Sequence, residues 1–317
     1  MDKISYSLVK VAKCNSYVET LGSSADSLHQ WIKNCYEEDF KRAFELQVKK
    51  AVKRLGVSFA KLAFDITNEP FYGRTRNLHV FNTAGDKKYD GEFKFLTACL
   101  ITRNKQIPIM GVPLIVGEGS GVKGTIELLE YCQTLFKRIR FAVFDRGFYV
   151  AELIDYLESK KIKYLMLVPK MKGKITSYYE QTTELGIFRH EMKYSKKKSC
   201  WKPNTNIVIC KGIGTDKNGK LLDWIFATNI KFKTRVEYVW HYKRRWQIET
   251  NYRVEDEAHI KSKSTSYMIR YFYFLISLLL HLLWIVNKNI AYYVQFKKYL
   301  DIIEHKLLYN YLELDQM

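Results

Sequence analysis

The chain of 317 residues is 47% hydrophobic and 15% aromatic, which excludes an intrinsically disordered protein because that much apolar surface can form a packed core. Its 52 Lys and Arg residues against 33 Asp and Glu give a formal charge of +19, which favours a polyanionic partner, either nucleic acid or an anionic membrane surface. The six cysteines show neither zinc-finger spacing nor a disulfide framework, so a reducing, intracellular setting is expected.

Residues 1–58 are predicted to form a helical N-terminal region. Apolar residues recur there at helical spacing, for example Leu28, Trp31 and Ile32. The region is either a helical cap on the following domain or a small DNA-binding module. The N-terminus has no continuous apolar core with a small-residue cleavage site, so no secretory signal is expected and the expected location is the cytoplasm.

The pattern changes to strands at residue 59. The runs FAKLAFDI, FKFLTACLIT and IPIMGVPLIV are predicted strands, the last two joined by the turn-like RNKQ. A helix at about 121–138, the strand RFAVFD, a helix at about 149–160 and the strand KYLMLVP follow. Three strands followed by alternating helices and strands indicate an α/β fold, with a mixed sheet flanked by helices.

The remaining chain is predicted to contain a β-rich insertion, two helices and a C-terminal tail. Residues of about 174–230 are polar and β-prone, a helix follows at about 234–260, and a helical tail is expected at 291–317. The apolar run at 271–286 is shorter than the roughly 20 residues that span a bilayer, and it contains Ser277 and His281. A buried core helix is therefore expected, with His281 as a core histidine.

The predicted helix at 234–260 carries the stretch HYKRRWQIETNYR, in which Glu249 is the one acid among three arginines and a lysine. Tyr242, Arg245 and Glu249 fall on one helical face, because offsets of three and seven residues return to the same side of a helix. Arg245, Glu249 and Arg253 also follow i, i+4 steps, so a solvated helix with weak ion pairs is the simpler interpretation of this stretch alone.

Two strand-end acids favour a second interpretation. Asp65 and Asp145 each end an apolar run, where an ionised carboxylate is costly unless it is paired or bound to a cation. Either residue alone is explained as a capping or turn aspartate. Together with Glu249 they supply the hard oxygen ligands that Mg²⁺ prefers, and two such ions can assist an in-line phosphoryl displacement.

Three blocks of the sequence resemble those of IS4-type DDE transposases, which move insertion sequences. YKRRWQIETNYR resembles the family signature, whose Tyr, Arg and Glu match Tyr242, Arg245 and Glu249. FDRGFY at 144–149 and FDITNEPFYG at 64–73 resemble the blocks around the second and first catalytic aspartates of the family. The resemblance covers roughly residues 59–287.

The resemblance implies an RNase H-like DDE catalytic domain, here expected at residues 59–290, that cuts and rejoins DNA in cut-and-paste transposition. It implies that Asp65, Asp145 and Glu249 are the catalytic residues and the ligands of two Mg²⁺ ions, for which Mn²⁺ is an expected substitute. Double-stranded DNA, as element ends and as target, is the implied partner. A homodimer in the synaptic complex, a nucleoid-associated location on DNA and no membrane association are also expected.

The resemblance further implies which residues contact DNA. Tyr242 and Arg245 are expected at a phosphate near the cleaved end, a role that suits guanidinium geometry. Lys170 and Lys172 follow the strand KYLMLVP, where family members often place basic DNA contacts, although solvated surface lysines are an equal alternative. Arg253 is the further DNA-binding residue expected on the helix.

Asp256 departs from the family signature, which usually has a lysine seven residues beyond the glutamate. An acid cannot neutralise a phosphate, so that contact is expected to be lost or to shift to Arg253 or Lys261. Two further hypotheses therefore stay open beside an active transposase. One is a catalytically decayed copy that only binds DNA, and the other is a membrane-associated basic protein built around the helix at 271–286.

Overall fold

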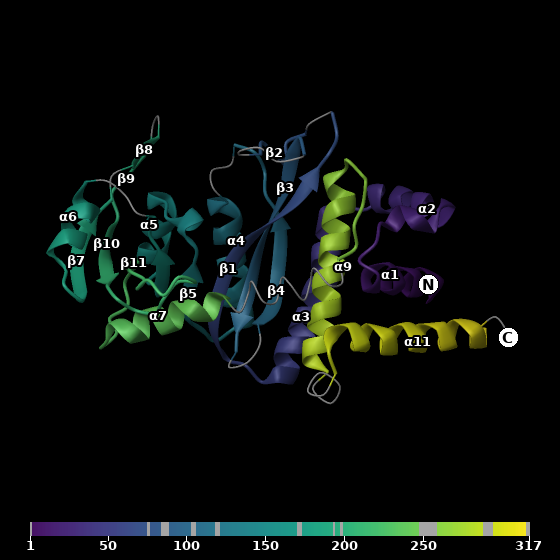
Figure 1. The fold of residues 1–317 in the computed structure, drawn as a ribbon. Coiled ribbons are helices and arrows are strands. Elements are labelled where there is room, and N and C mark those ends of the chain that lie inside the picture. The colour runs from purple at the N-terminus through teal and green to yellow at the C-terminus, as the bar shows by residue number, and fades with distance from the viewer. Residues whose placement is uncertain are drawn as a thin grey trace.

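A mixed sheet of nine strands forms the centre of the described part of the molecule in the computed structural model (Figure 1). The structure describes residues 2–74, 77–83, 89–102, 106–117, 121–169, 173–192, 194–196, 199–246, 259–287 and 294–314. The strands are β1 (Phe59–Phe71), β2 (Val80–Phe81), β3 (Gly91–Ile101), β4 (Gln106–Pro113), β5 (Arg138–Phe144), β6 (Tyr164–Leu167), β7 (Leu185–Glu191), β10 (Asn204–Cys210) and β11 (Trp224–Thr228). Their order is β2-β3-β1-β5-β6-β11-β10-β7, and β4 also pairs with β3.

β1 lies in the middle of this sheet. It pairs antiparallel with β3 and parallel with β5, and β5 pairs parallel with β6. β3 and β4 are buried along almost their whole length, and β5 is buried from Phe141 onwards, as expected for strands covered by helices on both faces. The predicted RNase H-like mixed sheet flanked by helices is confirmed.

The region predicted as a β-rich insertion extends the same sheet. It begins with the helix α6 (Lys174–Gln181), and its strand β11 pairs antiparallel with β6, with Phe226 opposite Leu167. β10 and β7 continue the sheet beyond β11. The short strands β8 (Tyr194–Lys196) and β9 (Ser199–Trp201) form a separate hairpin.

Helices cover both faces of the sheet. α4 (Val122–Leu135) and α5 (Ala151–Ser159) pack on one face, where Gly124 of α4 lies against the side chains of Leu96 and Val112. α7 (Arg235–Lys243) and α9 (Tyr267–Val286) lie on the other face (Figure 1). There Phe274 of α9 stacks on Phe95 of β3 with ring centroids 4.5 Å apart.

The N-terminal and C-terminal helices gather at one end of the molecule (Figure 1). These are α1 (Asp2–Lys13), α2 (Ser23–Lys33), α3 (Glu37–Leu55) and α11 (Phe296–Leu314), with the 3-10 turn η1 (Val18–Leu21) between α1 and α2. Lys13 forms ion pairs with Asp301 and Glu304, which join α1 to α11. Helices are therefore present in both terminal regions where the sequence predicts them.

α9 is the one helix among the described residues that is long and apolar enough to span a membrane, and 72% of its apolar window is buried inside the protein. His281 is fully buried and packs against Trp284 and Phe296. The prediction of a core helix with a core histidine is confirmed, and this burial counts against a protein anchored in a membrane by α9.

The helix predicted at about 234–260 lies partly outside the described residues. α7 ends at Lys243, the 3-10 turn η3 (Arg244–Trp246) follows, and residues 259–266 are not helical. The buried side chain of Gln106 donates to the carbonyl oxygen of Arg244, and Lys261 pairs in extended form with Tyr17. The start of the predicted helix is therefore found as α7, and its course over residues 247–258 stays a prediction.

Candidate active site

The parallel pairing of β1 and β5 places two acids side by side. Phe64 is the register partner of Phe144, so the residues that follow them, Asp65 and Asp145, lie next to each other. The rings of the two phenylalanines stack with centroids 4.9 Å apart on the opposite face of the sheet, which fixes this register. Asp65 is also opposite Thr97 of β3, and Asp145 opens the 3-10 turn η2 (Arg146–Phe148) after β5.

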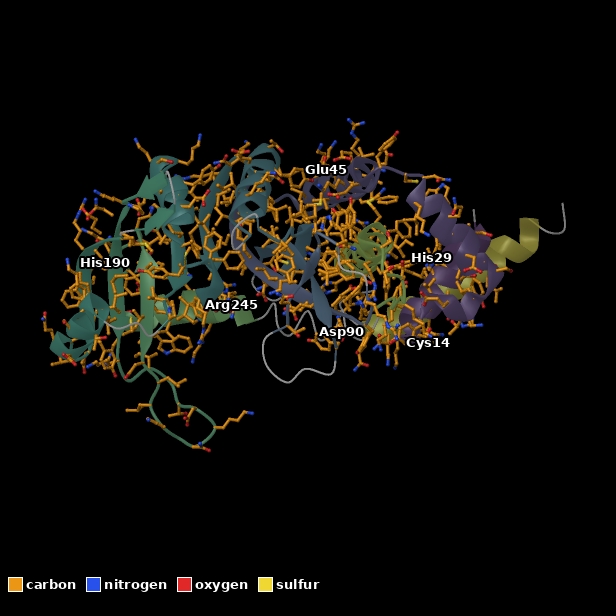
Figure 2. All side chains as sticks on the ribbon, turned by 90° about the horizontal axis from the view of Figure 1, so that it is seen from above. Cys14, His29, Glu45, Asp90, His190 and Arg245 are labelled. Atoms are coloured by element: carbon orange, nitrogen blue, oxygen red, sulfur yellow. The ribbon has the colours of Figure 1, made fainter. Side chains whose placement is uncertain are left out.

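The C-terminal end of α7 and the turn η3 bring two further side chains to these acids. The hydroxyl of Tyr242 donates a hydrogen bond to Oδ1 of Asp145 at 3.1 Å. The guanidinium of Arg245 lies 3.6 Å from Oδ2 of Asp65 and 3.9 Å from Oδ1 of Asp145. Figure 2 shows Arg245 near the middle of the long axis of the molecule. Arg245 therefore bridges two carboxylates from adjacent strands.

Burial and the neighbouring side chains set the protonation states of Tyr242 and Arg245. Burial raises the pKa of the fully buried Tyr242, so its phenol stays neutral and acts as a donor. Burial alone would lower the pKa of Arg245, but Tyr242, Asp65 and Asp145 outweigh it and the pKa is raised. Arg245 is thus a permanent cation that offsets one of the two negative charges of the aspartates.

A fully buried glutamine at the start of β4 supports the turn that carries Arg245. Gln106 Nε2 donates to the carbonyl oxygen of Arg244 at 2.9 Å and lies 3.5 Å from that of Arg245. Arg244 in turn donates to the carbonyl oxygen of Thr102 at 2.9 Å. Sequence reasoning missed Gln106, because RNKQ reads as an exposed turn and nothing in it signals a buried amide.

Asp145 lines a groove of about 740 Å³, together with Tyr242 and Arg245. The side chains of Asp65 and Asp145 are 19% and 35% exposed, so solvent and a substrate can reach both carboxylates. Lys243 lies over the ring of Trp224 at one wall, 5.7 Å from its centroid. Other groove residues are Arg146, Leu167, Val168, Pro169, Leu222 and Asp223.

Four of the residues predicted for the site are described, and the structure brings all four together: Asp65, Asp145, Tyr242 and Arg245. The other predicted site residues, together with the departing acid, lie outside the described residues: Glu249, Arg253, Lys170, Lys172 and Asp256.

Two carboxylates of the described site are suitable ligands for a hard divalent cation. Asp65 and Asp145 supply carboxylate oxygens of the kind that Mg²⁺ binds, and both are partly exposed. Within the described ranges, no group of three or more His, Cys, Asp or Glu side chains is arranged to hold a metal ion. Glu249, the third ligand that the resemblance implies, lies outside these ranges.

By fold, the chain is an RNase H-like α/β protein with acids on two neighbouring parallel strands. The sequence model of the family described as "Transposase DDE domain" matches residues 72–284. The chain belongs to this family of DDE transposases. The matched range contains Asp145, Tyr242, Arg245 and Glu249, and it begins seven residues after Asp65.

The fold is similar to that of piggyBac transposase, as seen in the cryo-EM structure of its synaptic complex with hairpin DNA. The TM-score is 0.52 at 17% identity, over 79% of this chain and 52% of that chain, so this chain spans about half the length of that protein. The crystal structure of the NurA nuclease from Sulfolobus solfataricus gives a TM-score of 0.33 at 9% identity, over 80% of this chain and 97% of that chain, which is too low to indicate a shared fold. No curated protein matches the sequence.

Proposed function

We propose that the chain is an active transposase of an insertion sequence, of the IS4 type, that cleaves and transfers DNA strands by two-metal phosphoryl transfer. The observation that carries this proposal is the parallel β1–β5 register, which sets Asp65 beside Asp145 under the Tyr242 and Arg245 of the transposase signature. Neither a cap nor a solvated surface helix requires these four side chains to meet.

Asp65, Asp145 and Glu249 would hold two Mg²⁺ ions, which would activate the attacking oxygen and stabilise the leaving oxygen. Tyr242 would orient the Asp145 carboxylate through its hydrogen bond to Oδ1, and Asp145 lines the groove. Arg245 lines the same groove and holds a fixed positive charge beside the carboxylates. Its forked guanidinium suits a phosphate oxygen of the strand near the cleaved end.

The proposed partner is double-stranded DNA, as element ends and as target. The charge of +19 and the synaptic complex formed by piggyBac transposase with hairpin DNA support this partner and a homodimer that holds two ends. We propose residues 1–58, 59–290 and 291–317 as the helical N-terminal region, the catalytic domain and the helical tail, with Arg253, Lys170 and Lys172 as further DNA contacts. On DNA the protein would be nucleoid-associated, with no membrane association.

The test is strand cleavage of DNA that carries the sequences flanking the gene. Wild type, Asp65→Asn, Asp145→Asn and Glu249→Gln would be compared in Mg²⁺, in Mn²⁺ and in EDTA. We expect cleavage at the element boundary by wild type alone and only with a metal, while all four proteins bind the DNA in EDTA. Equal cleavage by wild type and the three amide variants would refute the assignment of these carboxylates.

A decayed copy that only binds DNA is the second candidate, and Asp256 at the usual lysine position favours it. This candidate predicts salt-dependent binding without cleavage in any metal. The Asp256→Lys variant separates the two functions. Cleavage that appears only in this variant would establish the decayed copy, whereas wild-type cleavage would exclude it.

A further inference from the structure

A second cavity, of about 610 Å³, lies beyond the aspartates at the C-terminal end of β1. Its walls come from the end of β1, the irregular segment 259–266, the start of α9 and Tyr17 near the N-terminus. The segment KSKSTS at 261–266 forms much of one wall, and no part of the proposed cleavage chemistry uses it.

Among the described residues that line this cavity, the one carboxylate is paired with an arginine. Glu69 is 6% exposed, and its two oxygens lie 3.3 Å from Nε2 of His259 and 3.5 Å from Nη1 of Arg270. Arg270 also donates from Nε to the carbonyl oxygen of Ser264 at 2.9 Å, which ties the helix start to the irregular segment. This part of the wall is therefore preorganised.

Two lysines on the same wall have their charges available. Among the described residues, neither Lys261 nor Lys263 forms an ion pair, and Lys263 lies over the ring of Tyr17 at 5.5 Å from its centroid. The backbone beneath them is fixed, since Val18 donates to the Lys261 carbonyl oxygen at 2.9 Å and Lys263 N donates to Glu19 at 2.7 Å.

The charges of the lining side chains favour an anion. Lys261, Lys263 and Arg270 outnumber Glu69 and leave an excess of two positive charges with His259 neutral. The 20-residue helix α9 begins at the same wall, so the positive end of its dipole adds to this field. Ser264 and Thr265, beside the lysines, add hydroxyl donors of the kind that bind phosphate oxygens, whereas the buried Ser262 already donates to Glu19.

We propose that this cavity binds a phosphodiester group of the DNA strand, about two nucleotides from the phosphate held at Asp65 and Asp145. Glu69 lies four residues beyond Asp65 on the same face of β1, which is about 13 Å at roughly 3.3 Å per residue. One strand of a duplex rises about 3.4 Å per phosphate and also winds around the axis, so neighbouring phosphates are roughly 7 Å apart and about two steps span this distance. The inference rests on the proposed transposase function and adds a second anchor for its DNA.

The test is DNA binding in EDTA as a function of salt, which does not depend on cleavage. The variants are Lys261→Ala/Lys263→Ala and Lys261→Gln/Lys263→Gln. The matched control is Lys160→Ala/Lys163→Ala, whose exposed lysines precede β6 at the end of that strand away from the Asp145 groove. Each lost phosphate contact lowers the slope of log K against log salt by about 0.9, so we expect a decrease of about 1–2 for both cavity variants and none for the control.

Single methylphosphonate substitutions, which remove one phosphate charge each, locate the contact. A neutral linkage one to four nucleotides from the cut, on one side, should weaken binding by wild type and by the control, but not by either cavity variant. Equal weakening of all four proteins, or an unchanged salt slope in both cavity variants, would overturn the inference. If the inference is overturned but wild type still cleaves DNA in Mg²⁺, the proposed transposase function is retained. If wild type neither binds nor cleaves DNA, the phosphate cavity and the transposase function are both refuted.

Discussion

Replacing Gln106 by leucine tests whether the β3–β4 hairpin holds the turn that carries Arg245. Leucine has a similar size but no donor, so the carbonyl oxygen of Arg244 loses a hydrogen bond of 2.9 Å inside the protein. A buried acceptor left without its partner costs about 1–3 kcal/mol. The second contact, at 3.5 Å to Arg245, is at the limit of a hydrogen bond and adds little. We expect the free energy of unfolding to fall by about 2 kcal/mol.

Activity should fall by more than this loss of stability explains. Arg245 lies 3.6 Å from Asp65 and 3.9 Å from Asp145, so a small shift of the turn changes its position relative to both carboxylates. A misplacement of about 1 Å can cost roughly 100-fold in rate. We therefore expect strand cleavage by Gln106→Leu to fall about 10- to 100-fold at saturating Mg²⁺, with a smaller change in DNA binding in EDTA, because Arg245 is one of several proposed DNA contacts.

The assay pairs urea unfolding with single-turnover cleavage well below the unfolding transition. The exposed Gln181 at the end of α6 supplies the control Gln181→Leu, which removes the same side-chain amide without a buried partner. A stability loss of about 2 kcal/mol with wild-type cleavage would show that Gln106 only stabilises the fold. An unchanged urea midpoint would refute the reasoning about the buried hydrogen bond itself.

Three further predictions concern the same face of the sheet. Asp145→Asn should lower cleavage at least about 100-fold, measured with Mg²⁺, because a metal ligand contributes several kcal/mol. Tyr242→Phe should lower cleavage about five- to tenfold, as expected for one hydrogen bond. Burial raises the pKa of Tyr242, so the hydrogen bond is intact below pH 10 and the ratio of wild-type to variant rates should stay constant from pH 7 to 9. Burial, with Lys61 and Arg244, lowers the pKa of His241 from 6.5 to about 4, so the unfolded state takes up a proton first and stability should fall as the pH drops from 6.5 towards 4. Urea midpoints at pH 7 and pH 5 should show a smaller decrease for His241→Phe than for wild type.

The strands and their acids could be predicted from the sequence because each is a local pattern. The apolar runs before Asp65 and Asp145 are long enough to indicate buried strands, and β1 and β5 are found where these runs lie. The apolar run at 271–286 indicated a core helix for the same reason, and α9 covers it. Tyr242 and Arg245 were predicted from the signature and do reach Asp145.

The parts that sequence reasoning missed depend on contacts between distant residues. Gln106, which bonds the backbone of the turn after α7, lies more than 130 residues earlier in the chain. The sheet extends through β11 because Phe226 pairs with Leu167, and no local pattern distinguishes such pairing from a separate insertion. The cavity at Lys263 was missed because its second wall comes from Tyr17, which only the fold brings there.

The alternation of β1 explains why a protein of charge +19 keeps acids inside its sheet. Asp65 and Glu69 share one face of the strand, because side chains two residues apart point the same way. Each is met by an arginine from a nearby helical segment, Arg245 from the turn η3 after α7 and Arg270 from the start of α9. Guanidinium is less strongly hydrated than ammonium and binds carboxylates through several donors, so arginine is the cation suited to these buried pairs.

Lysines, in contrast, are the cations proposed to contact the DNA backbone. Lys261 and Lys263 keep a hydrated ammonium at the cavity, where a mobile point charge can follow a phosphate backbone. Exchanging arginine and lysine should therefore have different effects at the two positions. Arg270→Lys is expected to lower the urea midpoint, because Glu69 loses a partner that also bonds the Ser264 carbonyl, whereas Lys263→Arg is expected to leave both the midpoint and the salt slope of DNA binding unchanged. Equal effects of the two exchanges would contradict this division between buried arginine and accessible lysine.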